Sequence, residues 1–436
     1  MIRKTFVYKS FVCFALTCAF PAWAGSANLS ALYQMALEND AEYAAARESF
    51  KAGQEKIPQG RAGLLPTISL GANARYNQAR SSISPSTSYD SRSLSLTFTQ
   101  PLYRKQNLEA FEQSKVQALL SEQQLKLAEQ NLLLSVAQAY FAVLQAQDVL
   151  ATAQSQKQAY AEQLAQARKG FEVGTVTITD THEAQARYDL TTAQEIAAQN
   201  DLEVKRRSLE KIISRETPEL AGLVTEAKLV LPEPNNMDAW VKQAEEDSVS
   251  VHLGQSALEL ARRDVLRQRG GHHPTLDLSA NYSDSRNPSS TIASSRAGSI
   301  GLELGWLLYQ GGIVDSRVRE AVALREKARY ELDNSRRQAR LDARQGFLGV
   351  LSGDAQVTAL EQALVSSEAQ LKSTKLGLEV GVRTRVDVLN AQQQLFTTRR
   401  DLAAARYQTL IAGLQLKAAA GRLSEDDFKA IDALLK

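Results

Sequence analysis

The sequence predicts a mainly α-helical fold with a membrane β part, built from two similar halves. Two short segments share one pattern, GFEVGTVTITD from Gly170 and GLEVGVRTRVD from Gly377. Each ends a long stretch that has helical periodicity and contains no proline. Two other pairs of segments alternate apolar and polar residues, which is the pattern of half-buried strands. Because these features recur in the same order, the chain is interpreted as a duplication.

Residues 1–24 have the features of a secretory signal peptide. A basic start and an apolar stretch precede Ala22-Trp23-Ala24, which fits a cleavage site. The alternative is a lipoprotein acylated at Cys18, but Ala15-Leu16-Thr17 makes a poor lipobox. Both cysteines, Cys13 and Cys18, lie in this segment, so we expect a mature chain without disulfides or thiolate metal sites.

The charge balance argues against nucleic acid as a partner. The chain has 51 Lys and Arg against 49 Asp and Glu, and loss of Arg3, Lys4 and Lys9 with the signal peptide leaves 48 basic side chains. This balance produces no global positive field. Beyond the signal peptide there is no run of about 20 apolar residues, so no transmembrane helix is predicted. Any contact with a bilayer is therefore expected from strands.

The first repeat is predicted over residues 25–217. Its opening helical stretch ends near Pro66, and apolar and polar residues then alternate from Ile68 to Tyr76. The remaining elements follow in order: a β-hairpin over 67–103 with a Ser- and Pro-rich loop at 77–92, a long helix over 104–169, a tip at 170–180 and a return helix over 180–215.

The second repeat is predicted over residues 236–420. Residues 28–76 align without a gap onto 236–284, a shift of 208. The elements again follow in order: a helical stretch, a β-hairpin over 275–309 with its loop at 284–297, a long helix over 314–376, a tip at 377–387 and a return helix over 387–420.

The two long helices are expected to be members of a coiled coil. Proline is absent between Pro101 and Pro218 and again after Pro288, and a helix of this length extends about 100 Å. Apolar residues recur at spacings of three and four. Shorter helices should stack end to end beside each long one. Residues 218–235 form a linker that we expect to lie beside the rods together with residues 421–436.

Each predicted strand has about ten residues, which is the length of an outer-membrane strand. Aromatic residues are expected at the strand ends as an interfacial girdle: Tyr76, Tyr103, Tyr282, Trp306 and Tyr309. The alternative is a soluble hairpin packed on a helix. Four strands cannot close a membrane barrel, so copies must share it. Two copies would form an eight-stranded barrel whose interior is filled by side chains. Three copies would form a twelve-stranded barrel with a lumen, and the polar inward face of the strands favours this arrangement.

These segments resemble the TolC family of outer-membrane channel-tunnels. The resemblance covers the whole mature chain, including PTISL from Pro66, PTLDL from Pro274, both tips and ARYQTLIAGLQLKAAAGRLSEDD near the C-terminus. It implies a homotrimer whose twelve-stranded barrel continues into a periplasmic helical tunnel with an equatorial part. It further implies a passive exit duct for type I protein secretion, multidrug efflux or both. A periplasmic adaptor and an inner-membrane transporter of the ABC, RND or MFS class would be the partners.

The resemblance also assigns roles to residues at the periplasmic mouth. Asp180 and Arg383 occupy positions like those of a gating ion pair, and Asp387 matches a first acidic ring. Asn390 stands where some members have a second ring Asp, and Leu378 where some have a latching Tyr. Without the family, Arg383 and Asp387 are an i, i+4 pair that contributes a few tenths of a kcal/mol.

The turns of the two tips are expected to be the docking points for the adaptor. Small residues there expose backbone and shallow grooves: Val173, Gly174, Val380 and Gly381. The competing interpretation is a non-channel periplasmic rod or an adaptor, although the chain lacks the many short strands of an adaptor's β domain.

No catalytic motif points to an enzyme, and no cofactor is expected. The sequence contains four histidines and no H-E-x-x-H, nucleophile elbow or P-loop. His272 and His273 are adjacent and could bind a metal, but beside Pro274 they are expected to face solvent.

Overall fold

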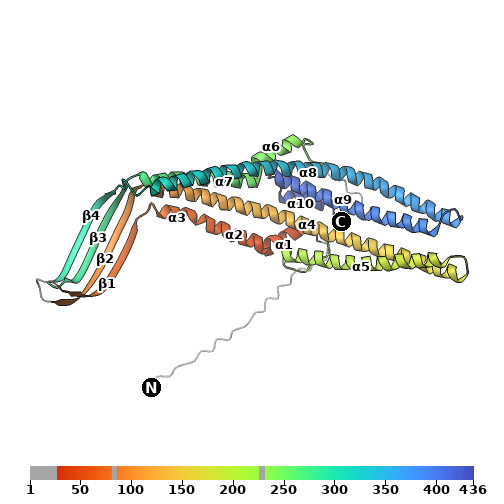
Figure 1. Cartoon of the computed structure of the whole chain (residues 1–436), viewed down its shortest axis with the longest axis horizontal. Coiled ribbons are helices and arrows are strands. Elements are labelled where there is room, and N and C mark those ends of the chain that lie inside the picture. Colours follow the sequence, from red (N-terminus) through yellow and green to blue (C-terminus); the bar gives the residue numbers. More distant parts are fainter. Residues whose placement is uncertain (1–26, 81–85, 225–230) are drawn as a thin grey trace, which may run out of the picture.

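The computed structural model describes residues 27–80, 86–224 and 231–436. Figure 1 shows a long rod of helices with a four-stranded sheet at one end and two helical tips at the other. The predicted signal peptide at 1–24, and with it the alternative acylation site at Cys18, lies outside the described residues.

Each half of the chain builds one long helix with shorter helices beside it. The first half contains α1 Leu29–Asn39, α2 Ala41–Gln54, α3 Lys56–Ala62, α4 Lys105–Glu172 and α5 Ile178–Ile213. The second half contains α6 Met237–Asp247, α7 Val249–Arg269, a short 3-10 helix Gly270–His272, α8 Ile313–Glu379, α9 Arg385–Ala419 and α10 Glu425–Asp432.

The long helices α4 and α8 determine the length of the rod. They contain 68 and 67 residues, which corresponds to about 100 Å each. Near the sheet, α2 and α3 pack on α4 while α7 packs on both α4 and α8; near the tips, α5 and α9 run back along α4 and α8. Shorter helices therefore stack end to end beside each long one, as the sequence predicts.

The four strands form a single antiparallel sheet in the order β1-β2-β3-β4. Their bounds are β1 Thr67–Ala79, β2 Thr87–Arg104, β3 Thr275–Ser289 and β4 Ile292–Gly305. The central pair, β2 and β3, joins the two halves of the chain. There the Arg104 guanidinium donates to both oxygens of Asp277, with Nε–Oδ1 2.9 Å and Nη2–Oδ2 2.5 Å.

The strands are longer than the sequence suggested, and the predicted loops at 77–92 and 284–297 are wrong in extent. Asn77 pairs with Tyr89, and Arg286 pairs with Ser294. The polar residues in these segments support pairing because their side chains bond across strands, as Asn77 Nδ2 does to Ser91 Oγ at 2.7 Å. The placement of Tyr76 and Tyr282 at strand ends is also wrong, since both strands continue beyond them.

The main core lies half-way along the rod. Tyr140 is fully buried and donates to the carbonyl oxygen of Ala221 at 2.7 Å. The segment that contains Ala221 pairs with the end of the chain, where Gly222 and Lys436 exchange two backbone hydrogen bonds of 3.1 and 2.8 Å. Packing is therefore densest where parts of residues 218–235 and 421–436 meet α4 and α1.

Among the described residues one helix, α4, is long enough and contains a sufficiently apolar 18-residue segment to cross a membrane by length and composition alone. Half of those residues are buried inside the protein. Helices α1, α5 and α9 cover it, so its apolar composition is explained by its place in the core.

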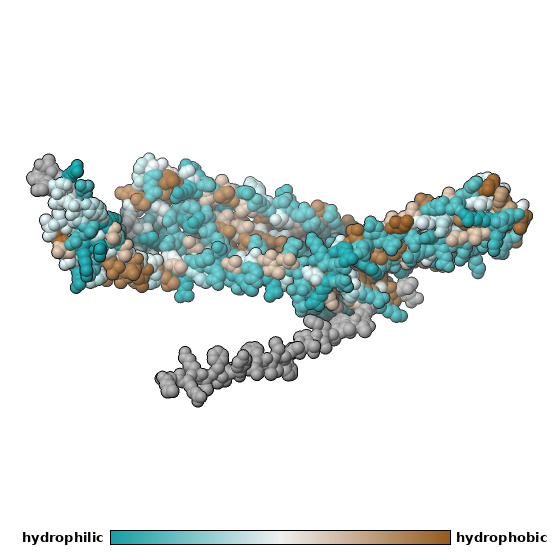
Figure 2. All heavy atoms as spheres, turned by 90° about the horizontal axis from the view of Figure 1, so that it is seen from below, coloured by the Kyte–Doolittle hydropathy of each residue, from teal (hydrophilic) through white to brown (hydrophobic). Residues whose placement is uncertain are grey.

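The sheet has a strongly exposed apolar face. Ile300, Leu302 and Leu304 are 77%, 67% and 70% exposed, while the alternate residues Gly301 and Glu303 are small or polar. Figure 2 shows apolar side chains gathered where the sheet meets the helices and again at the far tips. Exposed apolar patches of this kind indicate contact with a membrane or another protein.

Candidate functional site at the helical tips

The first tip is a tight turn that glycine makes possible. Helix α4 ends at Glu172, and Gly174 adopts a left-handed backbone with φ 73°. The N–H of Thr175 then donates to the carbonyl oxygen of Gly170 at 2.8 Å. Residues other than glycine adopt this conformation at a cost, so the glycine fixes where the helix stops.

The second tip repeats this geometry. Gly381 has φ 79°, and the N–H of Val382 donates to the carbonyl oxygen of Gly377 at 2.9 Å. A Cβ added at Gly377 would lie 2.7 Å from Cγ of Arg383. The first glycine of this motif therefore makes room for a side chain of the turn, and the second supplies the backbone conformation.

A capping box starts the return helix at each tip. Thr177 Oγ1 donates to Asp180 Oδ2 at 2.8 Å and accepts from the Asp180 N–H at 3.2 Å. Thr384 and Asp387 make the same two bonds at 2.9 and 3.2 Å. Each carboxylate satisfies backbone and side-chain donors at the start of its own helix.

The capping interactions also hold Asp387 in its charged form. The Thr384 backbone N–H, followed by its hydroxyl and the positive charge of Arg383, lowers the pKa of the Asp387 carboxyl. Among the described residues, Arg383 forms no ion pair with Asp180 or with Asp387. An Asp180–Arg383 bond would therefore have to form between copies of the chain.

One functional candidate escaped the sequence analysis. Arg187, on α5, donates through Nη2 to Asn390 Oδ1 at 3.0 Å and through Nη1 to Gln393 Oε1, both on α9. Another hydrogen bond joins Gln163 of α4 to Gln392 of α9. Arg187 lies two turns after Asp180, which is a sequence clue to a shared face, but the partner helix could not be read from spacing.

The turns carry apolar side chains that have no cover within the chain. Val173, Val380 and Val382 are 73%, 64% and 75% exposed. The two turns lie at the end of the rod opposite the sheet (Figure 1), where Figure 2 shows apolar side chains on the surface. Exposed apolar side chains of this kind are typical of surfaces that contact other proteins.

The two adjacent histidines lie where the sheet meets the helices. His273 Nδ1 is 3.2 Å from the hydroxyl of Tyr103, and His272 Nε2 is 3.3 Å from Asp315 Oδ1. Trp306 donates through Nε1 to the carbonyl oxygen of His272 at 3.1 Å. Two of the predicted interfacial aromatics are thereby fixed to this junction. The described part of the chain contains no group of three or more His, Cys, Asp or Glu that could hold a metal ion.

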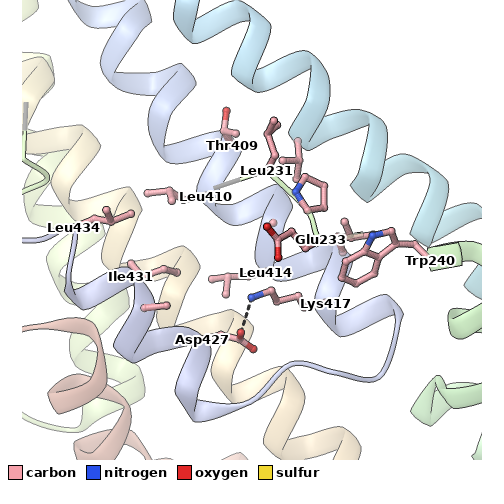
Figure 3. Close-up of a pocket in the computed structure, with 15 residues that line it drawn as sticks. Leu231, Glu233, Trp240, Thr409, Leu410, Leu414, Lys417, Asp427, Ile431 and Leu434 are labelled. Carbon is pink, nitrogen blue, oxygen red and sulfur yellow. Dashed lines mark hydrogen bonds and ion pairs between the residues drawn. The ribbon is translucent and has the colours of Figure 1, made fainter. Parts of the chain in front are cut away.

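A cavity of about 300 Å³ lies beside α9 and α10, and Figure 3 shows the side chains that line it. Its walls are mostly apolar side chains of α9 and α10, including Leu410, Leu414 and Ile431. At its edge Lys417 Nζ bonds to Asp427 Oδ1 at 2.6 Å.

Comparison with known proteins identifies the family. The family described as outer membrane efflux protein matches residues 32–215 and again 240–422. The chain belongs to the outer membrane efflux protein family. The two matched segments coincide with the two structural halves. The family model therefore matches each repeat of the duplicated chain once.

Curated relatives of this family match along almost the whole chain. Outer membrane protein TolC of Escherichia coli K12 is 34% identical over 429 residues, covering 95% of this chain and 86% of the relative. Outer membrane protein TolC of Vibrio cholerae is 33% identical, covering 94% of each. The alkaline protease secretion protein AprF of Pseudomonas aeruginosa is 31% identical, covering 92% and 86%.

Solved structures share the fold at lower identity. The outer membrane protein VceC of Vibrio cholerae has a TM-score of 0.78 at 19% identity, covering 90% of this chain and 96% of its own. The Campylobacter jejuni CmeC outer membrane channel has a TM-score of 0.82 at 16% identity, covering 93% and 89%. The predicted fold class and the resemblance to the TolC family are confirmed.

The family and the fold together show what the protein does and where it lies. This efflux-family protein is an outer-membrane exit duct: its sheet lies in the outer membrane and its helical tunnel projects into the periplasm. A non-channel periplasmic rod or adaptor is not favoured.

Proposed function

We propose that three copies of the chain assemble into one duct that passes secreted proteins, drugs or both from a periplasmic assembly to the outside. The single observation that carries this proposal is the open sheet. Its outer strands β1 and β4 each pair on one side only among the described residues. Because lipid offers no hydrogen bonds, both edges must pair with strands of other copies.

The long helix α8 supports the same assembly. Six apolar side chains with heptad-type spacing are exposed along it: Tyr330, Leu341, Leu348, Leu351, Val365 and Leu376. This spacing forms the apolar seam of a coiled coil. A helix of a neighbouring copy is the partner that would bury it.

The tips fit the role of a closed mouth and a docking point. The Val173-Gly174 and Val380-Gly381 turns lie farthest from the sheet (Figure 1) and expose apolar side chains. We infer that hairpin tips of a periplasmic adaptor dock there. An inner-membrane transporter of the ABC, RND or MFS class supplies the energy, since the duct contains no nucleotide-binding motif.

Four residues form the proposed gate. Asp180 of one copy pairs with Arg383 of the next, which keeps the mouth narrow in the resting state. Asp387 provides a ring of carboxylates, and Asn390 continues that face of α9 one turn further without charge. Low-dielectric walls focus the field of such a ring and favour cations.

The names of relatives point to two substrate classes. AprF and PrtF are named for protease secretion, and BepC of Brucella suis is named as an efflux protein. Deletion of the gene in its own host should be scored for drug sensitivity and for proteins missing from the medium. Plasmid-borne wild-type protein should restore whichever export is lost. A deletion strain that exports drugs and proteins normally would refute the proposed function.

A further inference from the structure

The guanidinium of Arg187 forms a bridge between the two halves of the tip region. It extends from α5 and donates to Asn390 and Gln393, which lie three residues apart on α9. Its Nη2 also lies 3.5 Å from Glu183 Oε1 on its own helix. Two amide acceptors and one nearby carboxylate therefore fix the fork of one arginine, and its side chain is only 23% exposed.

This bridge has no substitute between the same two helices. Across the described residues, every side-chain hydrogen bond that joins α5 to α9 is made by Arg187. Elsewhere in the tip half, α9 is bound to α4, through Gln163 and Gln392 and farther away through Tyr407 and Asp148. Separation of α5 from α9 therefore breaks the Arg187 bonds first.

The bridge also determines the charge of the face on which Asn390 lies. Both acceptors on α9 are neutral amides, so no carboxylate of α9 balances the guanidinium. Asp387 lies one turn before Asn390 on the same helix and stays ionised because its pKa is lowered. The guanidinium, whose one carboxylate partner is Glu183 of its own helix, thus contacts α9 one turn beyond the carboxylate expected to attract cations.

We propose that Arg187 is a specificity-determining residue of the channel mouth: it ties α5 to α9 within one copy and offsets the field of the Asp387 carboxylates. This proposal rests on the proposed function of the tips as the mouth of the duct. It changes the expected role of Asn390. An aspartate there would pair with Arg187, so it would not act as a second free acidic ring.

Substitutions at Arg187 can separate the effect of its positive charge from the effect of its hydrogen bonds between α5 and α9. Arg187→Lys keeps the charge but loses the planar fork that spans two acceptors. Arg187→Gln removes both. Reversal potentials in planar bilayers under a salt gradient measure the effect of the charge on ion selectivity. Single-channel conductance measures whether loss of the hydrogen bonds between α5 and α9 widens the mouth. Far-UV circular dichroism and heat-modifiable trimer migration serve as folding controls.

Arg187→Gln should raise the cation-to-anion permeability ratio by about twofold or more, since a unit charge about 8 Å from a passing ion changes its local concentration by that factor in water. Conductance should also rise. Arg187→Lys should raise conductance while leaving the permeability ratio at the wild-type value. An unchanged permeability ratio in a folded Arg187→Gln trimer would overturn the proposal.

Arg168→Gln is the matched control. Arg168 is also a tip arginine that donates to a glutamine, Gln185 Oε1 at 2.6 Å, but this bond stays within the α4–α5 pair. Its loss should leave both conductance and the permeability ratio unaltered. Equal effects of the two substitutions would mean that any tip arginine has the same influence, and the assignment to Arg187 would fail.

Asn390→Asp tests the coupling. In the wild-type background the new carboxylate pairs with Arg187 and neutralises it, so the permeability ratio should rise about as far as in Arg187→Gln, while the retained tie keeps the conductance at the wild-type value. In the Arg187→Gln background it is free and should shift the ratio further toward cations. A permeability ratio that stays at the wild-type value in Asn390→Asp would refute the proposal. A folded trimer without any conductance, in all variants including wild type, would instead refute the proposed function as a duct.

Discussion

Tyr407 donates a hydrogen bond to Asp148 across 2.7 Å and so joins α9 to α4 half-way along the rod. The Tyr407 ring packs on Phe141 with their centroids 5.7 Å apart. Burial raises the pKa of the Asp148 carboxyl, and the Tyr407 hydroxyl partly opposes that shift. The hydrogen bond that joins the two halves of the chain is thus accepted by a carboxylate that is largely shielded from water.

Removal of either partner should change stability in a pH-dependent way. Because the folded pKa of Asp148 is raised, its contribution is fully present below the unfolded value of about 3.9 and is lost as the pH rises through the folded value. Asp148→Asn should therefore be at least as stable as wild type at pH 7. Tyr407→Phe should lose about 1 to 2 kcal/mol at pH 7 and less in acid. Melting of the trimer at pH 5 and pH 7.5 checks this, and identical Tyr407→Phe and wild-type melts at both would contradict it.

The hairpin ends should face the outside of the cell. Ser86 precedes β2, and Ser290 lies in the turn between β3 and β4. Cysteines introduced at these two positions should react with an impermeant thiol reagent on intact cells. A cysteine at Val173, at the opposite end of the rod, is the control and should react only after lysis. Labelling of all three only after lysis would reverse or abolish the proposed orientation.

The turn glycines should separate folding from docking. Nothing lies within 4 Å of a Cβ placed at Gly381, but its positive φ disfavours most side chains. Gly381→Asn retains access to the left-handed region and should preserve export. Gly381→Leu should abolish export, because its bulk covers the docking surface, while the trimer still assembles. If Gly381→Leu no longer forms the trimer, Gly381 is required for folding and the proposed docking role is not supported.

Loss of Arg383 should open the resting mouth. Such an ion pair in a partly exposed place contributes about 1 kcal/mol at most, repeated in each copy. Arg383→Ser should raise conductance in planar bilayers and sensitise cells to large antibiotics. Arg385→Ser, two residues further on, is the control and should leave both unaltered. An unchanged conductance in Arg383→Ser would mean that other contacts keep the periplasmic mouth closed.

The local features of the tips were predictable because short-range chemistry determines them. Glycine at a left-handed position and threonine at a helix start act within a few residues, so Gly174 and Thr177 could be assigned from sequence. The absence of proline and the apolar spacing likewise predicted the long helices. Strand ends were missed, because serine and asparagine are typical of loops yet pair well when a neighbouring strand continues.

The Arg187 bridge lay beyond sequence reasoning for a different reason. Its acceptors are more than 200 residues away in the chain, and their approach depends on how two coiled pairs pack. Spacing places Arg187 on a helix face but names no partner. The capping role of Asp180, by contrast, was within reach of local rules, since Thr177 stands three residues before it.

That the protein forms a continuous duct through the outer membrane is tested most directly in planar bilayers. The purified heat-modifiable trimer should produce discrete, cation-selective conductance steps, and Asp387→Ala should reduce that selectivity. Because the pKa of Asp387 is lowered, wild-type selectivity should persist at pH 5, above the ordinary carboxyl value of about 3.9. A folded trimer that inserts but conducts no ions, in wild type and in Arg383→Ser alike, would contradict the central claim.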